Sequence, residues 1–165
     1  EIFEENVVNI RRAGGIIMKV VTKWNGQRAF TAVGDSGYEV SMDATPAYGG
    51  EGKGCTPTEM LLASLAGCIG IDVTMILKPY LSSVDKLEIE TDGTRKEELP
   101  KGFTSIVVTF IIDGQVDSKR IWRAINLGKE KYCAVSDSLK ADISFRLILN
   151  GEEQAKIVTD QNQGE

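Results

Sequence analysis

The sequence predicts an α+β fold in a single domain over residues 16–150. The 165-residue chain has 42% hydrophobic and 26% charged residues, the usual balance for one globular domain with a core of its own. Short segments with the apolar–polar alternation of half-buried strands occur on both sides of a long apolar segment. That apolar segment begins with a capping pattern at Thr56, which predicts a helix.

Three strands are predicted before this helix. Alternation runs through residues 16–24, 28–33 and 38–43, and turn signals separate these segments at Asn25-Gly26 and at residues 34–37. The pattern predicts a three-stranded meander. Residues 1–15 precede it without a basic segment followed by an apolar run, so we interpret them as an N-terminal extension and not as a signal peptide.

The glycine-rich segment at residues 48–54 does not fit a phosphate-binding loop. Gly54 follows Lys53 where such a loop needs Ser or Thr, and Ala47 stands where it needs its first glycine. We therefore interpret this segment as a flexible connection to the helix.

The central helix is predicted to run from Thr56 to about Pro79. Thr56 is the N-cap, Pro57 occupies the first helical position, and Glu59 completes a capping box. Residues 60–71 are uncharged and apolar almost all round, which predicts a helix that is buried on every side. This run of 12 residues is too short to cross a bilayer, which needs roughly 20.

The second half of the chain alternates strands and helices. A turn at residues 100–102 predicts that the strands on either side of it form an antiparallel pair. Asp117 is the predicted cap of an amphipathic helix that ends at Gly128. The remaining predictions are strands at 86–94, 103–113 and 144–149, a short helix at 129–140, and a disordered tail at 151–165.

Charge and composition exclude several kinds of function. The net charge is −5 and the chain contains no histidine. An acidic protein is unsuited to bind nucleic acid or an anionic membrane surface. The absence of histidine removes imidazole bases, Cys-His pairs and most zinc sites. Any catalysis therefore depends on thiols, carboxylates, Lys, Arg, Tyr or a borrowed cofactor, and we expect no resident cofactor or metal.

The three cysteines are the best candidates for chemistry. An odd number in a chain of this size indicates a reducing compartment, so we expect a cytoplasmic protein. Taken alone, Cys68 on an apolar helix is typical of an inert core residue. Cys133 lies near a predicted helix N-terminus, and Lys129 and Lys131 close to it favour the thiolate. Cys55 is expected to be exposed and incidental.

Two cysteine motifs resemble those of the OsmC/Ohr family, whose members are named for osmotic induction and organic hydroperoxide resistance. Residues 52–68, followed by 70–73, are similar to its first motif, and residues 130–136 to its second. Phe103 to Ile106 fit the strand between the motifs, and Cys68 and Cys133 lie 65 positions apart. Gly-Ile-Asp at residues 70–72 is similar to the OsmC-like branch of the family.

The resemblance implies antiparallel sheets around a long central helix and an intertwined homodimer with its cysteines close together at the subunit interface. It also implies a thiol peroxidase that reduces organic hydroperoxides, and in some relatives hydrogen peroxide, in defence against oxidative stress. Cys68 is then the peroxidatic thiol and Cys133 the resolving thiol. An external dithiol, a lipoyl group in some relatives, is the reductant, and the apolar helix around Cys68 suits an apolar peroxide pocket.

The resemblance also indicates where activating groups are expected. Thr58 stands where the hydroperoxide reductases carry a glutamate, so Glu59 and Arg28 are the candidate activating residues. Asp72 follows Cys68 by four residues, on the same helical face, and its charge is expected to raise the pKa of the Cys68 thiol.

Two other functions fit the same residues. One is a non-catalytic dimeric protein that binds a hydrophobic ligand or senses redox state, which the absence of the glutamate favours. The other is a hydrolase or sulfur-transfer protein that uses a single cysteine. Cys55 is also able to replace Cys133 as the resolving thiol if its loop reaches the site.

Overall fold

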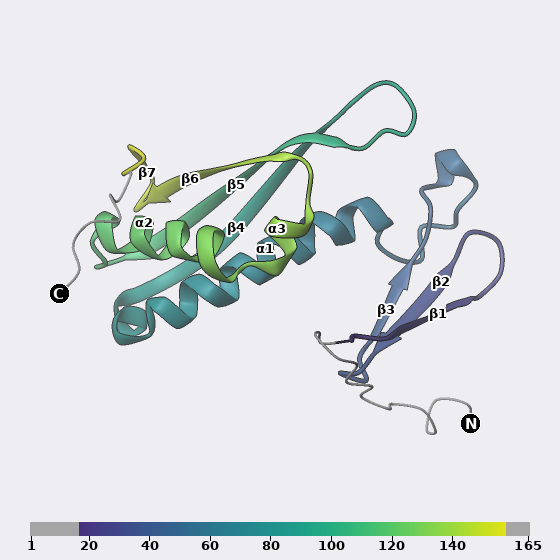
Figure 1. Cartoon of the computed structure of the whole chain (residues 1–165), viewed down its shortest axis with the longest axis horizontal. Helices are drawn as coiled ribbons and strands as arrows, with labels where there is room; N and C mark the ends of the chain where they lie inside the picture. The colour runs from purple at the N-terminus through teal and green to yellow at the C-terminus, as the bar shows by residue number, and fades with distance from the viewer. Residues whose placement is uncertain (1–16, 158–165) are drawn as a thin grey trace. The chain divides into compact units, whose positions relative to one another are not determined.

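The computed structural model describes residues 17–157, and the fold is α+β (Figure 1). The chain divides between Met60 and Leu61 into two compact units. The first contains a three-stranded sheet, and the second contains a four-stranded sheet with most of the helical residues. The single domain predicted over residues 16–150 stays a prediction. The N-terminal extension at 1–15 lies outside the described residues.

The first unit is an antiparallel meander, as predicted. Its strands are β1 (Val20–Trp24), β2 (Phe30–Gly34) and β3 (Glu39–Met42), in the order β1-β2-β3. The turn between β1 and β2 requires a positive φ at Gly26, where φ is 100°, a conformation that only glycine adopts without strain. This explains the Asn25-Gly26 signal in the sequence.

A buried aspartate organises the loop that was expected to be merely flexible. Asp43 is 2% exposed, and its carboxylate accepts hydrogen bonds from the backbone N–H groups of Ala44 (2.8 Å), Glu51 (2.9 Å) and Lys53 (3.1 Å). These bonds hold the pKa of Asp43 below its usual value. The loop includes a short helix η1 (Pro46–Tyr48). Its backbone is therefore held in place by hydrogen bonds to the buried Asp43 carboxylate.

Helix α1 (Pro57–Ile76) begins with the predicted capping box. Glu59 Oε2 accepts hydrogen bonds from the N–H (2.7 Å) and hydroxyl (2.9 Å) of Thr56, and the hydroxyl of Thr56 accepts one from the N–H of Glu59 (3.3 Å). The helix ends at Ile76, three residues earlier than predicted, and a tighter 3₁₀ helix η2 (Lys78–Ser83) follows. Pro79 explains the change, because proline cannot continue an α-helix.

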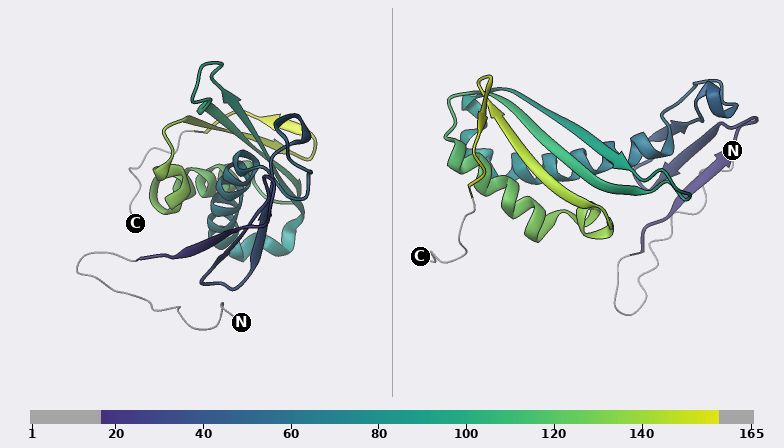
Figure 2. Two further views of the ribbon diagram at one scale, coloured as in Figure 1. Left: turned by 90° about the vertical axis from the view of Figure 1, so that its right-hand side faces the viewer. Right: turned by 90° about the horizontal axis from the view of Figure 1, so that it is seen from above.

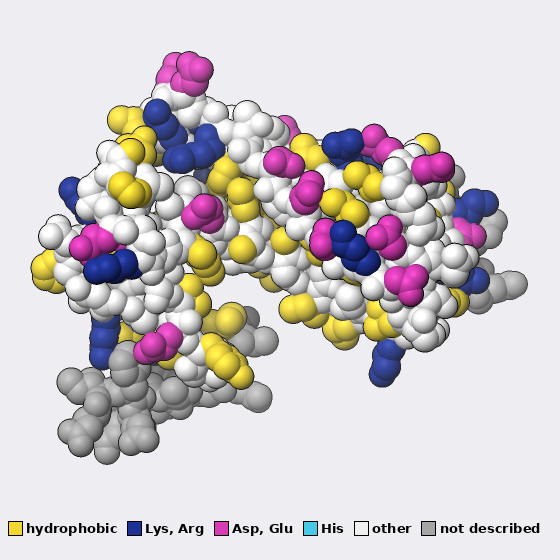
Figure 3. Space-filling view, turned by 180° about the vertical axis from the view of Figure 1, so that it is seen from behind, with side chains coloured by type: hydrophobic (Ala, Val, Ile, Leu, Met, Phe, Trp, Pro, Cys, Tyr) yellow, Lys and Arg dark blue, Asp and Glu magenta, His cyan; other side chains and the backbone are white. Residues whose placement is uncertain are grey.

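One face of α1 is buried and the other is open. Leu65, Ile69 and Val73 are fully buried, whereas Ile71 and Met75 are 63% and 69% exposed. The prediction of burial on every side is therefore wrong for the single chain. Figure 3 shows hydrophobic side chains, in yellow, among the charged ones at the surface.

The length of α1 also differs from its prediction. Among the described helices, α1 alone is long and apolar enough to span a membrane by length and composition, and 22% of that stretch is buried inside the chain. The argument that the apolar run is too short is thus wrong. The fully buried stripe of α1 nevertheless packs into the core of the second unit.

The second sheet has the strand order β4-β5-β6-β7. Its strands are β4 (Val84–Arg95), β5 (Phe103–Gly114), β6 (Asp142–Leu149) and β7 (Glu152–Gln154). β4 and β5 pair antiparallel across the predicted turn. β5 and β6, however, pair parallel, because the chain between them crosses over through helices. The sheet is therefore mixed, not purely antiparallel.

Strand β7 corrects the prediction for the tail. Residues 152–154 pair antiparallel with β6, where disorder was expected. A tight turn at Asn150 and Gly151, both with positive φ, makes this return possible. The last part of the predicted tail, residues 158–165, lies outside the described residues.

Helix α2 (Ser118–Leu127) starts as predicted, with the carboxylate of Asp117 accepting the N–H of Lys119 at 2.7 Å. α1 and α2 lie on one face of the four-stranded sheet (Figure 2). The core between them is formed by alternate residues of β5 and by buried residues of both helices, among them Phe110, Trp122, Leu65 and Ile69.

The helix predicted over residues 129–140 is interrupted. The chain forms a single π-helical turn, η3 (Gly128–Tyr132), and then a short helix α3 (Ala134–Ser138). Cys133, between them, has the extended backbone of an N-cap, with φ −74° and ψ 96°. The hydroxyl of Ser136 donates to the carbonyl of Cys133 at 2.9 Å, which stabilises the break.

Candidate functional site

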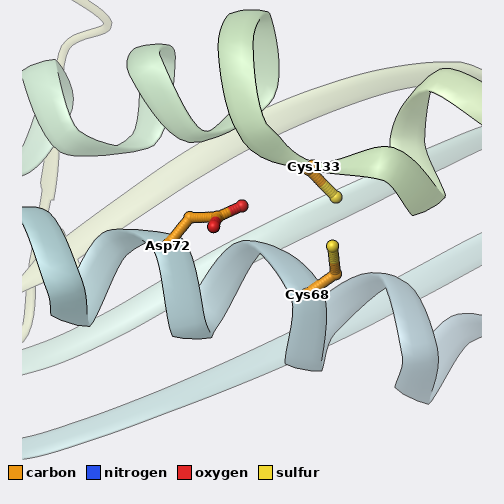
Figure 4. Close-up of side chains that lie close together, drawn as sticks. All are labelled: Cys68, Asp72 and Cys133. Atoms are coloured by element: carbon orange, nitrogen blue, oxygen red, sulfur yellow. The ribbon is translucent and has the colours of Figure 1, made fainter. Parts of the chain in front are cut away.

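The two predicted redox cysteines lie together in the second unit. Cys68 and Asp72 are one turn apart on α1, and Cys133 lies at the start of α3. The two sulfur atoms and a carboxylate oxygen of Asp72 all lie within 4.8 Å of one another. Figure 4 shows the three side chains pointing toward one another. Both cysteines are free thiols, so the site holds a reduced pair that is close enough to form a disulfide after small movements.

Packing against α1 places Cys133. Gly128 is buried, and a Cβ there would lie 3.4 Å from Cβ of Asp72, so the chain just before Cys133 runs directly along α1. Cys133 is 3% exposed, and its sulfur accepts a hydrogen bond from the N–H of Ser136 at 3.3 Å. The sulfur therefore caps α3, at the helix end where backbone N–H groups favour negative charge.

Lys129 does not serve this thiol directly. Its ammonium donates to the carbonyl of Ile143 at 3.2 Å and lies 5.7 Å from the ring centre of Phe145. Lys131 is exposed. The backbone donors of α3, rather than the two lysines, are thus the groups that contact the sulfur atoms.

The surroundings of Cys68 oppose its ionisation. Burial is the largest cause that raises the pKa of the Cys68 thiol, followed by its hydrogen bond with the Cys133 thiol. The N–H of Val135 acts in the opposite direction by donating to the Cys68 sulfur, and the charge of Asp72 adds a further small increase. The predicted effect of Asp72 is confirmed in direction, but burial dominates.

Replacing Asp72 with asparagine is expected to lower the pKa of Cys68, because a negative charge near the thiolate is removed. Since the thiol pKa is raised, its thiolate fraction at neutral pH is small and rises about tenfold per pH unit until the pKa is reached. The rate of Cys68 alkylation by iodoacetamide, followed against pH, should show its midpoint at lower pH in D72N. D85N, at an exposed position, is the control and should match the original protein; an unchanged midpoint in D72N would contradict the assignment.

The other predicted site residues belong to the first unit. Arg28 is exposed and lies beside Gly49. Cys55 is exposed, as predicted, and forms an isolated bridge with Met42. Glu59 is engaged in the helix cap, and its hydrogen bonds hold its pKa below the usual value. The structure brings Cys68, Asp72 and Cys133 together, and the catalytic roles of Arg28 and Glu59 stay predictions.

A hollow of about 390 Å³ lies next to α3, and no sequence pattern predicted it. Cys68 does not line this hollow, so the apolar peroxide pocket predicted beside Cys68 stays a prediction. Its lining consists of Lys129, Ser136, Asp137, Ala141, Asp142 and Ile143. The N–H groups of Val135 and Ser136 could not be predicted as site groups either, because every residue except proline has a backbone N–H. Only the position of α3 shows that these two face the sulfur atoms.

Comparisons with known proteins bear on the site. A family model described as OsmC-like protein matches residues 50–148, which include all three cysteines. Protein YhfA of Escherichia coli K12 is 33% identical over 129 residues, which cover 78% of this chain and 93% of YhfA.

Solved structures show the same fold. A hypothetical protein from Aquifex aeolicus VF5 superposes with a TM-score of 0.71 at 26% identity, over 81% of this chain and 96% of that one. The organic hydroperoxide resistance protein OhrB of Bacillus subtilis superposes with a TM-score of 0.52 at 22% identity, over 82% of this chain and 98% of OhrB. At that identity the likeness to OhrB concerns the fold alone.

Proposed function

Because this chain belongs to the OsmC-like protein family, we propose that it is a thiol-dependent peroxidase that reduces organic hydroperoxides in oxidative-stress defence. The observation that carries the proposal is the pair of reduced thiols, with Cys68 and Cys133 sulfur atoms within 4.8 Å of each other. The resemblance of both cysteine motifs to the OsmC/Ohr family supports the choice of substrate. Hydrogen peroxide is a second substrate under the same chemistry.

The proposed reaction has three steps: attack on the peroxide, formation of a disulfide, and reduction of that disulfide. The Cys68 thiolate attacks the peroxide oxygen and breaks the O–O bond, so that Cys68 becomes a sulfenic acid and the alcohol leaves after protonation. The Cys133 thiol then displaces hydroxide from that sulfur, which forms the disulfide and releases water. An external dithiol, for which a lipoyl group is our candidate, reduces the disulfide and is itself oxidised.

The positions of the two thiols suit these roles. Cys68 is partly exposed, as an attacking group must be, whereas Cys133 is 3% exposed and is shielded from direct oxidation. The N–H of Val135 donates to the Cys68 sulfur and stabilises negative charge on it. In hydroperoxide reductases a glutamate at the position of Thr58 activates the attacking thiol. We propose that the N–H of Val135 supplies part of that activation here.

The direct test adds one equivalent of cumene hydroperoxide to the reduced protein and maps its thiols by mass spectrometry. Two thiols should be lost, with a bond between Cys68 and Cys133 and a free Cys55. C55S, which removes the exposed thiol, is the matched control and should react alike. Unchanged thiols in folded protein, or a disulfide that involves Cys55, would contradict the roles assigned to Cys68 and Cys133.

A non-catalytic binding protein is the second candidate. The observation that favours it is the raised pKa of Cys68, which keeps the thiol mostly protonated at neutral pH. The same experiment separates the two functions, because a binding protein keeps its thiols when the hydroperoxide is added.

We propose Glu59 and Arg28 as assisting residues. Glutamine at position 59 keeps an oxygen that accepts the hydrogen bonds of Thr56, so the cap survives in E59Q. If Glu59 assists catalysis, E59Q should reduce hydroperoxide about 10-fold more slowly, while its melting temperature falls only slightly because the cap keeps its hydrogen bonds but loses its charge. A rate equal to that of the original protein would restrict Glu59 to capping the helix.

We propose that the protein is a cytoplasmic homodimer in which a second copy covers α1. The open face of α1 carries a stripe at four-residue spacing, formed by Ala63, Gly67, Ile71 and Met75, and all four are exposed in the single chain. The small side chains of Ala63 and Gly67 allow another backbone to approach closely. A second copy is the occupant that removes this apolar surface from water.

Replacing Ile71 with glutamate is expected to shift the protein from dimer to monomer, because it places a charge within this stripe. Analytical ultracentrifugation measures the change. L99E is the matched control, since Leu99 is 85% exposed and lies outside α1, and it should leave the dimer intact. A dimer that persists in I71E would place the interface elsewhere.

A further inference from the structure

We propose that Cys68, Asp72 and Cys133 form a binding site for a thiophilic divalent cation, with Zn²⁺ as the preferred ion. Two sulfur atoms and one carboxylate oxygen converge within 4.8 Å of one another from two segments of the chain. Zinc sites that retain an open position have three protein ligands of these types. This inference is independent of the proposed peroxidase, because it requires only the reduced thiols.

The geometry is close to that of a coordinated ion. With Zn–S bonds of about 2.3 Å in a tetrahedral arrangement, two sulfur ligands lie about 3.8 Å apart. The three ligand atoms already lie within 4.8 Å of one another, so small side-chain rotations bring them to coordination distance. Cys68 and Asp72 share one helical face, which fixes two of the three ligands on a rigid element.

A buried carboxylate oxygen without a hydrogen-bond partner supports this cation site. Oδ2 of Asp72 is buried and has no hydrogen-bond partner among residues 17–157. A buried carboxylate oxygen without a partner is costly, and it lies here beside two groups that also become anionic. A divalent cation at this point compensates the charge of all three groups at once.

Outer hydrogen bonds also suit a metal site. The N–H of Ser136 donates to the Cys133 sulfur at 3.3 Å, and the N–H of Val135 donates to the Cys68 sulfur. Such donors orient sulfur ligands and balance their charge. On binding, the two thiols release their protons to solvent, and a water molecule completes the fourth position.

The choice of ion follows from the ligands. Sulfur ligands select Zn²⁺ and Cd²⁺, whereas Mg²⁺ and Ca²⁺ require oxygen ligands. A bound ion occupies the same Cys68 sulfur that attacks a peroxide. Zinc and hydroperoxide therefore exclude one another at this site.

The test uses the whole reduced, metal-free protein and Zn²⁺ alone, measured by calorimetric titration in the absence of peroxide. One ion should bind per chain, raise the melting temperature, and be displaced by a chelator. Cd²⁺ should give a sulfur-to-metal charge-transfer band, whereas Mg²⁺ should not bind. No binding of Zn²⁺, or binding without the Cd²⁺ band, would overturn the site.

Variants assign the ligands. C68S and C133S should each bind Zn²⁺ at least about 100-fold more weakly, since loss of even an outer partner of a metal ligand costs about 10–100-fold. D72N, which keeps the shape of the side chain, should lose about 10-fold or more. C55S and D85N are the matched controls and should bind as the original protein does.

Each remaining outcome decides one hypothesis. Unchanged affinity in D72N, or lost affinity in C55S, overturns the three-ligand site. Failure of Zn²⁺ to bind leaves the peroxidase untouched, because that function is measured by thiol loss in metal-free protein. Conversely, thiols that survive hydroperoxide in a protein that binds Zn²⁺ reject the peroxidase and support the metal site.

Discussion

Replacing Cys68 with serine is expected to slow hydroperoxide reduction by about 10³-fold or more, because the reaction then lacks its attacking sulfur. A serine hydroxyl does not ionise at neutral pH and cannot form a sulfenic acid. The measurement is consumption of cumene hydroperoxide with a dithiol reductant in excess. Near-normal turnover in C68S would place the reacting thiol elsewhere.

The two cysteines should respond differently, which separates their roles. C133S retains the attacking thiol, so it should still react once and accumulate sulfenic acid, which dimedone traps. C55S is the matched control and should turn over normally, because it retains both Cys68 and Cys133. Equal loss of the first reaction in C68S and C133S would contradict these roles.

Replacing Phe110 with alanine is expected to lower the free energy of unfolding by about 3–5 kcal/mol. Phe110 is fully buried at the centre of β5, in the core between the sheet and helices α1 and α2. Removing its ring leaves a cavity that the surrounding side chains fill only partly. Urea denaturation followed by circular dichroism measures the change.

An effect of this size is a large part of the total stability, which for a typical domain is about 5–15 kcal/mol. L99A removes apolar atoms from a residue that is 85% exposed, so it is the matched control and should change stability by less than about 0.5 kcal/mol. A loss below about 1 kcal/mol in F110A would mean that the core repacks around the gap.

Local patterns determined most of the secondary structure. The meander, the capped start of α1 and the start of α2 are predictable because each depends on neighbouring residues: alternation, the Asn25-Gly26 turn, and side chains that satisfy the first N–H groups of a helix. The cysteine motifs likewise indicated the family, since both are continuous in sequence. Both cysteines could therefore be named before their distance was known.

Other features depend on contacts between distant segments. The parallel pairing of β5 with β6 requires the crossover, and strand β7 exists because β6 offers it an edge. The break at Cys133 interrupts a segment whose sequence favours a continuous helix. Local propensity is weak, and tertiary packing overrides it in such segments.

The sequence by itself thus determined the fold class, the family and the identity of the two cysteines. Tertiary structure alone decided that Cys133 joins Cys68 and Asp72, that backbone N–H groups of α3 contact both sulfur atoms, and that one face of α1 stays open. The physical reason is distance: helical spacing relates Cys68 to Asp72, but only the packing of the Gly128 segment against α1 brings Cys133 to them.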